Sequence, residues 1–318
     1  MIEVIIRFLV CICLLFLTGC LNKKTDGHQA KTDNVNDITD RRFVYPAIPD
    51  GLKPLEERRK YLLVHYWDHF DFNDTSYIHK PEISEQAFVD FIDILYNVSL
   101  PVASEAINEL MLRASVNWDM HNFIIDLFEK YLYDPNSPFR NEELYIPVLE
   151  FIKKSPTVRT EDLITAEYRL KMAQKNRTGM QATDFIFMTG AGRLKKLSDI
   201  KNDYILLYFN NPGCQACRQT AKRLLECPGS KDPRLTILAL YPDEDLTEWK
   251  KLKHEIPGEW INGYSPGGEI MKKQLYDLKA LPTLYLLDSK MKVLLKDAPI
   301  ERIVEYLDNK FAYNLIKQ

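Results

Sequence analysis

Apolar residues recur at helical spacing from residue 41 to about residue 177. Loops rich in Pro, Asn and Ser interrupt this pattern at intervals. We therefore expect a series of helices that begin near Pro54, Ser84, Pro101, Trp118, Glu142 and Glu161. Pro54 suits the first turn of a helix running to Phe70, and Ser84 suits a cap. Residues 41–178 are thus predicted to form an all-α domain.

The pattern changes after Gly179, where short apolar runs alternate with helical segments. Strands are predicted over residues 184–188, 204–209, 235–241, 284–287 and 291–295. Helices are predicted over residues 218–226, 246–256, 269–278 and 300–311. This alternation is typical of an α/β sheet domain, here with a terminal hairpin. We assign that domain to residues 179–318.

The N-terminus has the features of a targeting segment. The apolar run at residues 8–17 is too short for a membrane-spanning helix, which needs roughly 20 residues. It has the length of a signal-peptide core. The Leu-Thr-Gly-Cys sequence at residues 17–20 resembles the bacterial lipoprotein box. This resemblance implies that residues 1–19 are a lipoprotein signal peptide and that Cys20 is lipidated. The alternative is an ordinary secretory signal that is cleaved nearby.

Residues 20–40 contain almost no apolar side chains, so they cannot bury enough surface to offset the entropy of ordering. We interpret them as a disordered tether with a reach of roughly 25 Å. Acyl chains on Cys20 would hold the protein at a lipid bilayer. The resemblance implies the cell envelope of a Gram-negative bacterium, on the periplasmic side. Leu21 stands in place of the Asp that retains some lipoproteins at the inner membrane, which favours the outer membrane.

Composition limits the classes of partner. Hydrophobic residues make up 46% and charged residues 27% of the 318 residues, as in globular proteins. The 42 Lys and Arg are balanced by 45 Asp and Glu, which argues against a nucleic-acid partner. His65 and His69 would share a helix face, but the segment lacks the Glu of a zinc-protease helix and a third ligand. We expect no metal and no cofactor.

The candidate chemistry directly follows the apolar run at residues 204–209, where Cys214 and Cys217 form a Cys-x-x-Cys motif at a helix start. Unpaired N–H groups and the helix dipole there lower the pKa of Cys214 from the ordinary value of roughly 8.5. Cys217, one turn away, can resolve a mixed disulfide. A zinc site would need two further ligands that do not follow, and a structural disulfide closing so short a loop would add little stability. The motif therefore indicates redox chemistry.

With this motif in place, residues 182–310 resemble the thioredoxin superfamily, and within it the TlpA-like thiol–disulfide oxidoreductases of the bacterial envelope. The resemblance rests on the two cysteines, on Pro282, which is 65 residues after Cys217, and on an insertion between them. It implies that Cys214 is the nucleophile and Cys217 the resolving thiol. It also implies that Pro282 is a cis-proline beside the active site. The backbone of Leu281 would then pair with an extended substrate peptide.

Three positions depart from the family pattern. Gly213 stands where thioredoxins usually have Trp, Tyr208 where they have a buried Asp, and Thr220 where many TlpA-like proteins have Glu. The group that accepts the proton of the resolving thiol is therefore not identified by the sequence. Cys227, at the expected end of the same helix, is predicted to be a small buried packing residue rather than a third redox thiol.

These features predict an α/β thioredoxin-like domain, with a central mixed sheet flanked by helices, preceded by an all-α helical domain. In the helical part, residues 66–70 (Tyr-Trp-Asp-His-Phe) and 130–135 (Lys-Tyr-Leu-Tyr-Asp-Pro) faintly resemble an uncharacterised module that precedes thioredoxin-like domains in Gram-negative lipoproteins. The predicted function is a membrane-anchored thiol–disulfide oxidoreductase that acts on protein disulfides and is supplied by an upstream thiol donor. The class resemblance favours the reducing direction. The alternative is an envelope binding or scaffold lipoprotein, in which the helical domain engages a partner and the thioredoxin-like domain has little turnover.

Overall fold

The computed structural model describes residues 42–156 and 158–312. The predicted signal peptide, Cys20 and the tether lie outside these residues. From Arg42 onward the chain forms one compact unit. Within the described ranges no helix is both long enough and apolar enough to cross a bilayer. The boundary that we predict at residue 178 lies in the connection between a helical part and a part built on a sheet.

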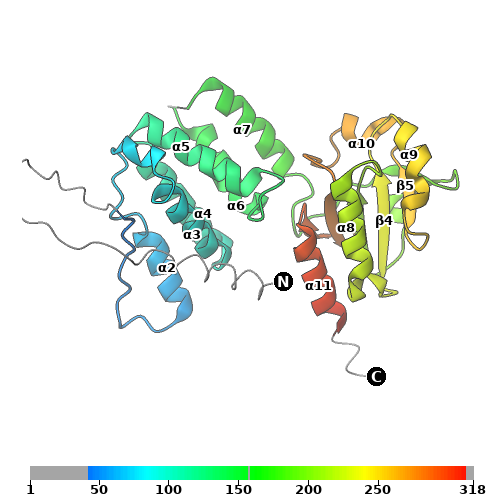
Figure 1. The fold of residues 1–318 in the computed structure, drawn as a ribbon, viewed down its shortest axis with the longest axis horizontal. Coiled ribbons are helices and arrows are strands. Elements are labelled where there is room, and N and C mark those ends of the chain that lie inside the picture. The colour runs from blue at the N-terminus through cyan, green and yellow to red at the C-terminus, as the bar shows by residue number, and fades with distance from the viewer. Residues whose placement is uncertain (1–41, 157, 313–318) are drawn as a thin grey trace, which may run out of the picture. The chain divides into compact units, whose positions relative to one another are not determined.

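The helical part contains all of the helices that the sequence predicts (Figure 1). They are α2 (Leu55–His65), α3 (Ser84–Tyr96), α4 (Leu100–Ala114), α5 (Trp118–Phe128), α6 (Glu142–Lys154) and α7 (Thr160–Ala173). A 3-10 turn over Thr75–His79 precedes α3, and a π-helical turn over Glu129–Tyr133 follows α5. The spacing of apolar residues was therefore sufficient to locate each helix.

A single aromatic-rich core holds these helices together. Four apolar residues on one face of α3 are at most 1% exposed: Phe88, Phe91, Ile92 and Leu95. The aromatic residues that follow α2 are buried in the same core. Trp67, for example, meets the ring of Phe70 edge-on, with ring centroids 5.4 Å apart. The aromatic residues after α2 thus belong to the hydrophobic core of the helical part.

The end of α2 and the start of α3 differ from the predicted ones. α2 ends at His65 rather than at Phe70, because the N–H groups of Asp68 and Phe70 donate to carbonyls three residues earlier, both at 3.1 Å. Such bonds tighten the chain into turns and direct the aromatic rings inward. Ser84 is the first residue of α3 rather than its cap, and its hydroxyl donates to Tyr77 O at 2.8 Å.

The second part is built on a seven-stranded mixed sheet with the order β2-β1-β5-β4-β3-β6-β7. The strands are β1 (Ile186–Thr189), β2 (Leu194–Lys196), β3 (Tyr204–Phe209), β4 (Leu235–Tyr241), β5 (Ile261–Tyr264), β6 (Thr283–Asp288) and β7 (Val293–Lys296). Its helices are α8 (Gln215–Glu226), α9 (Thr247–Leu252), α10 (Glu269–Lys272) and α11 (Ile300–Ala312). Figure 1 shows these helices flanking the sheet, which is the architecture that the sequence predicts.

The central strand β3 is buried on both faces. It pairs in parallel with β4 and antiparallel with β6. Leu206 and Tyr208 face the core that includes α8 and α11, whereas Leu207 and Phe209 face the core on the other side. This burial explains the continuous apolar run in the sequence. It also fixes the segment after β3, residues 210–217, at one end of the sheet.

The strand β5 is not predicted by the pattern of apolar residues. It pairs in parallel with β4 and antiparallel with β1. Asn262 and Gly263 both weaken a strand signal. Gly263 is nevertheless required, because a Cβ there would lie 2.8 Å from Met188 O and 2.9 Å from a ring atom of Phe187. The residue that obscures the strand in the sequence is the one that allows β1 to approach it.

The helix that begins at Glu269 is shorter than the sequence predicts. α10 ends at Lys272, and Gln274 has φ of 49°, in the left-handed region. The next carbonyl, Leu275 O, accepts a hydrogen bond from Asn176 Nδ2 at 2.8 Å. A partner from the helical part therefore replaces the bond that a longer helix would make, and the chain continues to β6 without regular structure.

We expect Gly263→Ala to lower the free energy of unfolding by about 1–3 kcal/mol, because the added methyl group would overpack the contact with β1. Gly258→Ala is the matched control, since a Cβ at Gly258 meets no atom within 4 Å. Urea or thermal unfolding of the two variants measures the difference. Equal stability of both variants would contradict the close approach of β1 and β5.

Candidate active site

The two cysteines of the motif share the first turn of α8. Cys214 is the N-cap of this helix, and the helix begins at the next residue. A helix start leaves N–H groups without intrahelical partners, and the one on Cys217 donates to Cys214 Sγ at 3.5 Å. Arg218 braces the turn by donating from its guanidinium to Pro212 O at 3.0 Å. The prediction that the Cys-x-x-Cys motif lies at the start of a helix is therefore confirmed.

Cys214 carries the reachable and more acidic sulfur. Its side chain is partly exposed. Burial alone would raise the pKa of Cys214, but hydrogen bonds from the backbone N–H and the thiol of Cys217, together with attraction to Arg218, outweigh burial and lower it. The dipole of α8 acts in the same direction. More of Cys214 is therefore thiolate near neutral pH than is usual for a cysteine.

Cys217 is held as a neutral thiol. Its side chain is 1% exposed. Burial raises the pKa of Cys217 to about 12, and the neighbouring Cys214 sulfur adds to the rise, while the backbone N–H of Asn211 opposes it from 3.4 Å. At pH 7 the Cys217 thiol is therefore protonated. The two thiols thus differ in the direction that the position on the helix predicts.

The loop before β6 faces the Cys214 sulfur. The Leu281–Pro282 peptide bond is cis, and Leu281 O lies 3.7 Å from Cys214 Sγ, within reach of a sulfur hydrogen bond. The sequence predicts both features, and both are confirmed. The side chain of Leu281 packs against both cores of the sheet domain. Its carbonyl is therefore held opposite the sulfur.

Tyr208 stabilises the site without serving as a base. Its hydroxyl donates to Cys217 O at 2.7 Å, and burial raises the pKa of Tyr208 well above the ordinary value. The phenol is therefore neutral and directed at the backbone of Cys217 rather than at its sulfur. Thr220, which stands where many TlpA-like proteins have Glu, is buried on α8. Neither side chain offers a carboxylate to the resolving thiol.

The sequence analysis overlooked Asn211. Its side-chain oxygen accepts from Gly213 N–H at 2.9 Å, while its own N–H donates to Cys217 Sγ. Asn side chains often bond to the backbone two residues later in turns, and this preference is the signal that could have indicated its role. A Cβ at Gly213 would lie 3.4 Å from that oxygen, an ordinary contact. Lack of space at the Cβ position therefore does not explain why Trp is missing from position 213.

Cys227 lies at the other end of α8 and is buried, as predicted for a packing residue. Its thiol donates to Asp308 Oδ1 at 3.3 Å, and burial raises the pKa of Cys227. A helix of 12 residues is about 18 Å long. Cys227 is therefore too far from Cys214 to exchange with it in this arrangement.

The histidine pair does not share a helix face, because α2 ends at His65. His65 Nδ1 instead pairs with Asp68 Oδ2 at 2.7 Å, and His69 lies in the turn that follows. Across residues 42–156 and 158–312, no three His, Cys, Asp or Glu side chains are grouped to hold a metal ion.

Comparison with known proteins places the chain in a family. A family model described as a domain of unknown function (DUF5106) matches residues 19–176. A search of curated proteins finds no match. Among solved structures, a thioredoxin-like protein from Bacteroides caccae is 48% identical, with a TM-score of 0.80, and the match covers 85% of this chain and 99% of that one. The chain belongs to this thioredoxin-like family.

Two further structures are similar to shorter parts of this thioredoxin-like protein. The C-terminal domain of an uncharacterized protein from Bacteroides fragilis is 42% identical, with a TM-score of 0.41, covering 42% of this chain and 97% of that one. The thioredoxin domain of a thiol-disulfide oxidoreductase from Bacteroides vulgatus is 24% identical, with a TM-score of 0.38, covering 42% of this chain and 96% of that one. The family assignment rests on the Bacteroides caccae protein.

We expect a limiting amount of iodoacetamide at pH 7 to label the thioredoxin-like protein first at Cys214. The lowered pKa and partial exposure of this thiol favour attack, whereas Cys217 and Cys227 are buried with raised pKa values. Peptide mass spectrometry locates the label, and unfolded protein is the control in which all three thiols react. Preferential labelling of Cys217 would reverse the assignment of nucleophile and resolving thiol.

Proposed function

We propose that this protein is a thiol–disulfide oxidoreductase that acts on protein disulfides through Cys214 and Cys217. The observation that carries the proposal is that Cys214 is partly exposed at the start of α8, whereas Cys217, one turn later, is 1% exposed. The pKa of Cys214 is lowered by hydrogen bonds and that of Cys217 is raised by burial. A nucleophile must be ionised and reachable, whereas a resolving thiol must stay protonated until the mixed disulfide has formed. The resting site meets both requirements.

In the reducing direction, the Cys214 thiolate attacks one sulfur of the substrate disulfide. A bond forms between Cys214 Sγ and that sulfur, the substrate S–S bond breaks, and the other substrate sulfur leaves as a thiolate. Cys214 then no longer carries the negative charge that helps to hold the proton on Cys217. The departing thiolate is a base that can accept this proton, so the missing carboxylate does not prevent the next step.

In the second step the Cys217 thiolate attacks Cys214 Sγ and forms the Cys214–Cys217 disulfide. The mixed disulfide breaks and the second substrate thiolate is released. Two electrons have passed from the protein to the substrate disulfide, and an upstream thiol donor must return two electrons to restore the dithiol. Reversing both steps oxidises a substrate dithiol. Resemblance to the TlpA-like class favours the reducing direction.

Leu281 and Pro282 form the substrate-binding element in this proposal. Both are half-buried, and the Leu281 carbonyl lies beside the reactive sulfur. An extended peptide that brings a disulfide to Cys214 passes along this backbone, where it can add as a strand. Side chains of any type can accompany such backbone pairing. The site therefore suits varied protein disulfides.

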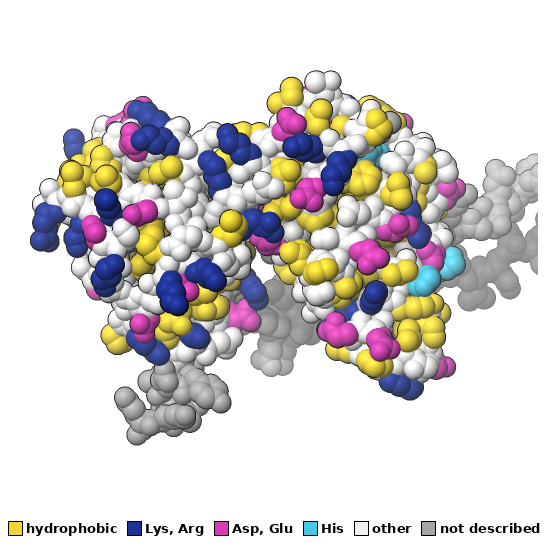
Figure 2. Space-filling view, turned by 180° about the vertical axis from the view of Figure 1, so that it is seen from behind, with side chains coloured by type: hydrophobic (Ala, Val, Ile, Leu, Met, Phe, Trp, Pro, Cys, Tyr) yellow, Lys and Arg dark blue, Asp and Glu magenta, His cyan; other side chains and the backbone are white. Residues whose placement is uncertain are grey.

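We place the protein in the periplasm-facing cell envelope, anchored in the lipid bilayer through Cys20, with the outer membrane favoured. The support is the sequence resemblance to the lipoprotein box. No nucleic-acid partner is proposed. On the face in Figure 2, Lys and Arg side chains are interspersed with Asp and Glu, and the net charge is −3. Nucleic-acid binding normally needs a basic excess.

We expect the protein to reduce insulin disulfides with dithiothreitol as electron source, and Cys214→Ser to fall to the rate of the uncatalysed control. Cys217→Ser should instead accumulate mixed disulfides, because Cys214 still attacks but nothing resolves the adduct. Non-reducing gels and mass spectrometry of cell extracts would identify the trapped partners. A wild-type rate equal to that of Cys214→Ser would favour the binding or scaffold function.

We expect Cys20→Ser to release the protein from membranes, because the acyl chains on Cys20 supply the binding energy. Membrane fractionation after a high-salt wash measures the effect. Cys227→Ser, a change in a buried cysteine of the folded part, is the control that should remain membrane-bound. Retention of Cys20→Ser in the membrane would place the anchor elsewhere.

A further inference from the structure

The segment between α10 and β6 is held by the helical part. Lys279 Nζ pairs with Glu142 Oε1, although the two residues are 137 positions apart in the sequence. Nearer α10, Asn176 Nδ2 donates to Leu275 O at 2.8 Å, and Lys175 Nζ donates to Gln274 O. The segment thus has at least three polar ties to the helical part.

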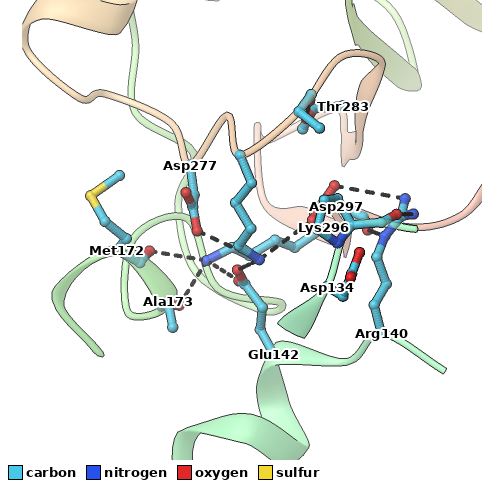
Figure 3. Close-up of polar contacts among 12 residues, drawn as sticks. Asp134, Arg140, Glu142, Met172, Ala173, Asp277, Thr283, Lys296 and Asp297 are labelled. Atoms are coloured by element: carbon cyan, nitrogen blue, oxygen red, sulfur yellow. Dashed lines mark hydrogen bonds and ion pairs between the residues drawn. The ribbon is translucent and has the colours of Figure 1, made fainter. Parts of the chain in front are cut away.

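Glu142, which makes the tie to Lys279, also pairs with a second lysine (Figure 3). It is the first residue of α6, and its two carboxylate oxygens bind two different lysines. Oε2 lies 2.7 Å from Lys296 Nζ. The side chains of Glu142, Lys279 and Lys296 are only 9%, 8% and 4% exposed. Charged groups this deeply buried are stable only when paired, so the three side chains have little freedom to rearrange.

Lys296 connects the same carboxylate to the end of α7. Its Nζ donates to Ala173 O and Lys175 O, both at 2.7 Å, and forms an ion pair with Glu142 (Figure 3). These carbonyls are among the unpaired acceptors that follow a helix C-terminus, where a positive charge is favoured. Glu142 is therefore fixed by Lys296 on one side while it holds Lys279 on the other.

Lys279 is also packed against an aromatic ring. Its Nζ lies 4.5 Å from the centre of the Tyr133 ring, and Arg169 approaches the same ring at 4.1 Å. Tyr133 is the last residue of the π-helical turn Glu129–Tyr133. The lysine is thus held by a carboxylate and a ring from the helical part. From the sheet part, Asp277 and Asp297 also pair with it, at the longer distances of 3.7 and 3.6 Å.

Lys279 is two residues before Leu281, whose carbonyl faces the reactive sulfur. Leu281 O lies 3.7 Å from Cys214 Sγ. Between them, Ala280 O accepts a hydrogen bond from Thr283 Oγ1 at 2.6 Å, which joins the loop to the start of β6. The loop has no regular structure of its own. A displacement of Lys279 is therefore passed along a short, braced stretch to Leu281.

We propose that Glu142 is a positioning residue, which holds the Leu281–Pro282 docking loop opposite Cys214 through Lys279. The helical DUF5106 region is then part of the substrate-capture machinery of the oxidoreductase. This inference rests on the proposed function, which supplies the reason why the position of the loop matters. It assigns to the helical region a contribution that is independent of the thiols themselves.

The test uses the full chain carrying Glu142→Gln, which keeps the shape of the side chain and removes its charge. We expect the catalytic efficiency (kcat/KM) with insulin disulfides to fall about tenfold, mainly through KM, since misplacing a positioning group by ~1 Å can cost up to about a hundredfold. The rate with the small disulfide DTNB, which needs no strand docking, should change less than about twofold. The alkylation rate of Cys214 should also be preserved.

Glu143→Gln is the matched control. Glu143 is the next residue of α6 and pairs with Arg177 rather than with the docking loop. It should leave both rates unchanged. If Glu142→Gln does not fold, as judged by its thermal unfolding, the double variant Glu142→Gln/Lys279→Met removes one buried charge of each sign. It should fold with the same selective defect. A folded variant that reduces insulin at the wild-type rate overturns the proposal.

Hydrogen–deuterium exchange separates this inference from the proposed function. If the wild-type protein reduces neither insulin nor DTNB, the proposed function fails. The positioning proposal is then judged on exchange in residues 273–283, which Glu142→Gln should increase relative to Glu143→Gln. Equal exchange in the two variants would show that Glu142 does not hold the loop.

Discussion

The backbone N–H of Cys217 donates to the Cys214 sulfur at the N-terminus of α8, and the rest of the site is arranged around this contact. α8 packs Cys217 and Leu224 into the core beneath the sheet, which leaves the N-cap sulfur at the surface. With a pKa of about 12, ionising Cys217 in the resting site costs roughly 4–5 kcal/mol more than ionising an ordinary thiol. That cost keeps the resolving thiol protonated. It falls once Cys214 becomes part of a mixed disulfide, because the negative sulfur is then gone, and proximity compensates for much of the rest.

The charges around Glu142 impose a second constraint. Replacing a buried ion pair by apolar residues is often neutral or stabilising, whereas removing one partner costs about 3–5 kcal/mol. Stability alone is therefore a weak reason for burying Lys279 and Lys296. Asp277 belongs to the same cluster, and its burial raises its pKa to about 7 despite the nearby Lys279. What such a cluster provides is a single permitted geometry, because any other placement leaves a buried charge unpaired.

The sequence was sufficient wherever a feature depends on near neighbours along the chain. The apolar spacing located α2 to α7, and the strand, turn and helix around Cys214 predicted its N-cap position. The cis bond at Pro282 was predicted from the family resemblance, which rests on the motif and on a Pro-Thr pair at the entry to a strand, and the structure confirms that bond. The features that the sequence analysis missed depend on contacts between residues that are far apart in the sequence. Gly263 weakens the signal of β5 because it fits against β1, a contact that no local pattern encodes.

The early end of α10 has the same explanation, and it links the two parts of the protein. Residues from Glu269 to Leu278 have the apolar spacing of a helix, but Lys175 and Asn176 bind the carbonyls of Gln274 and Leu275. The match to the DUF5106 family model ends at residue 176, which is one of these two residues. These two carbonyls therefore accept hydrogen bonds from the helical region instead of from the backbone of a longer α10. As a result, the segment between α10 and Leu281 has no regular structure. The conformation of the docking loop is thus determined jointly by both parts of the chain.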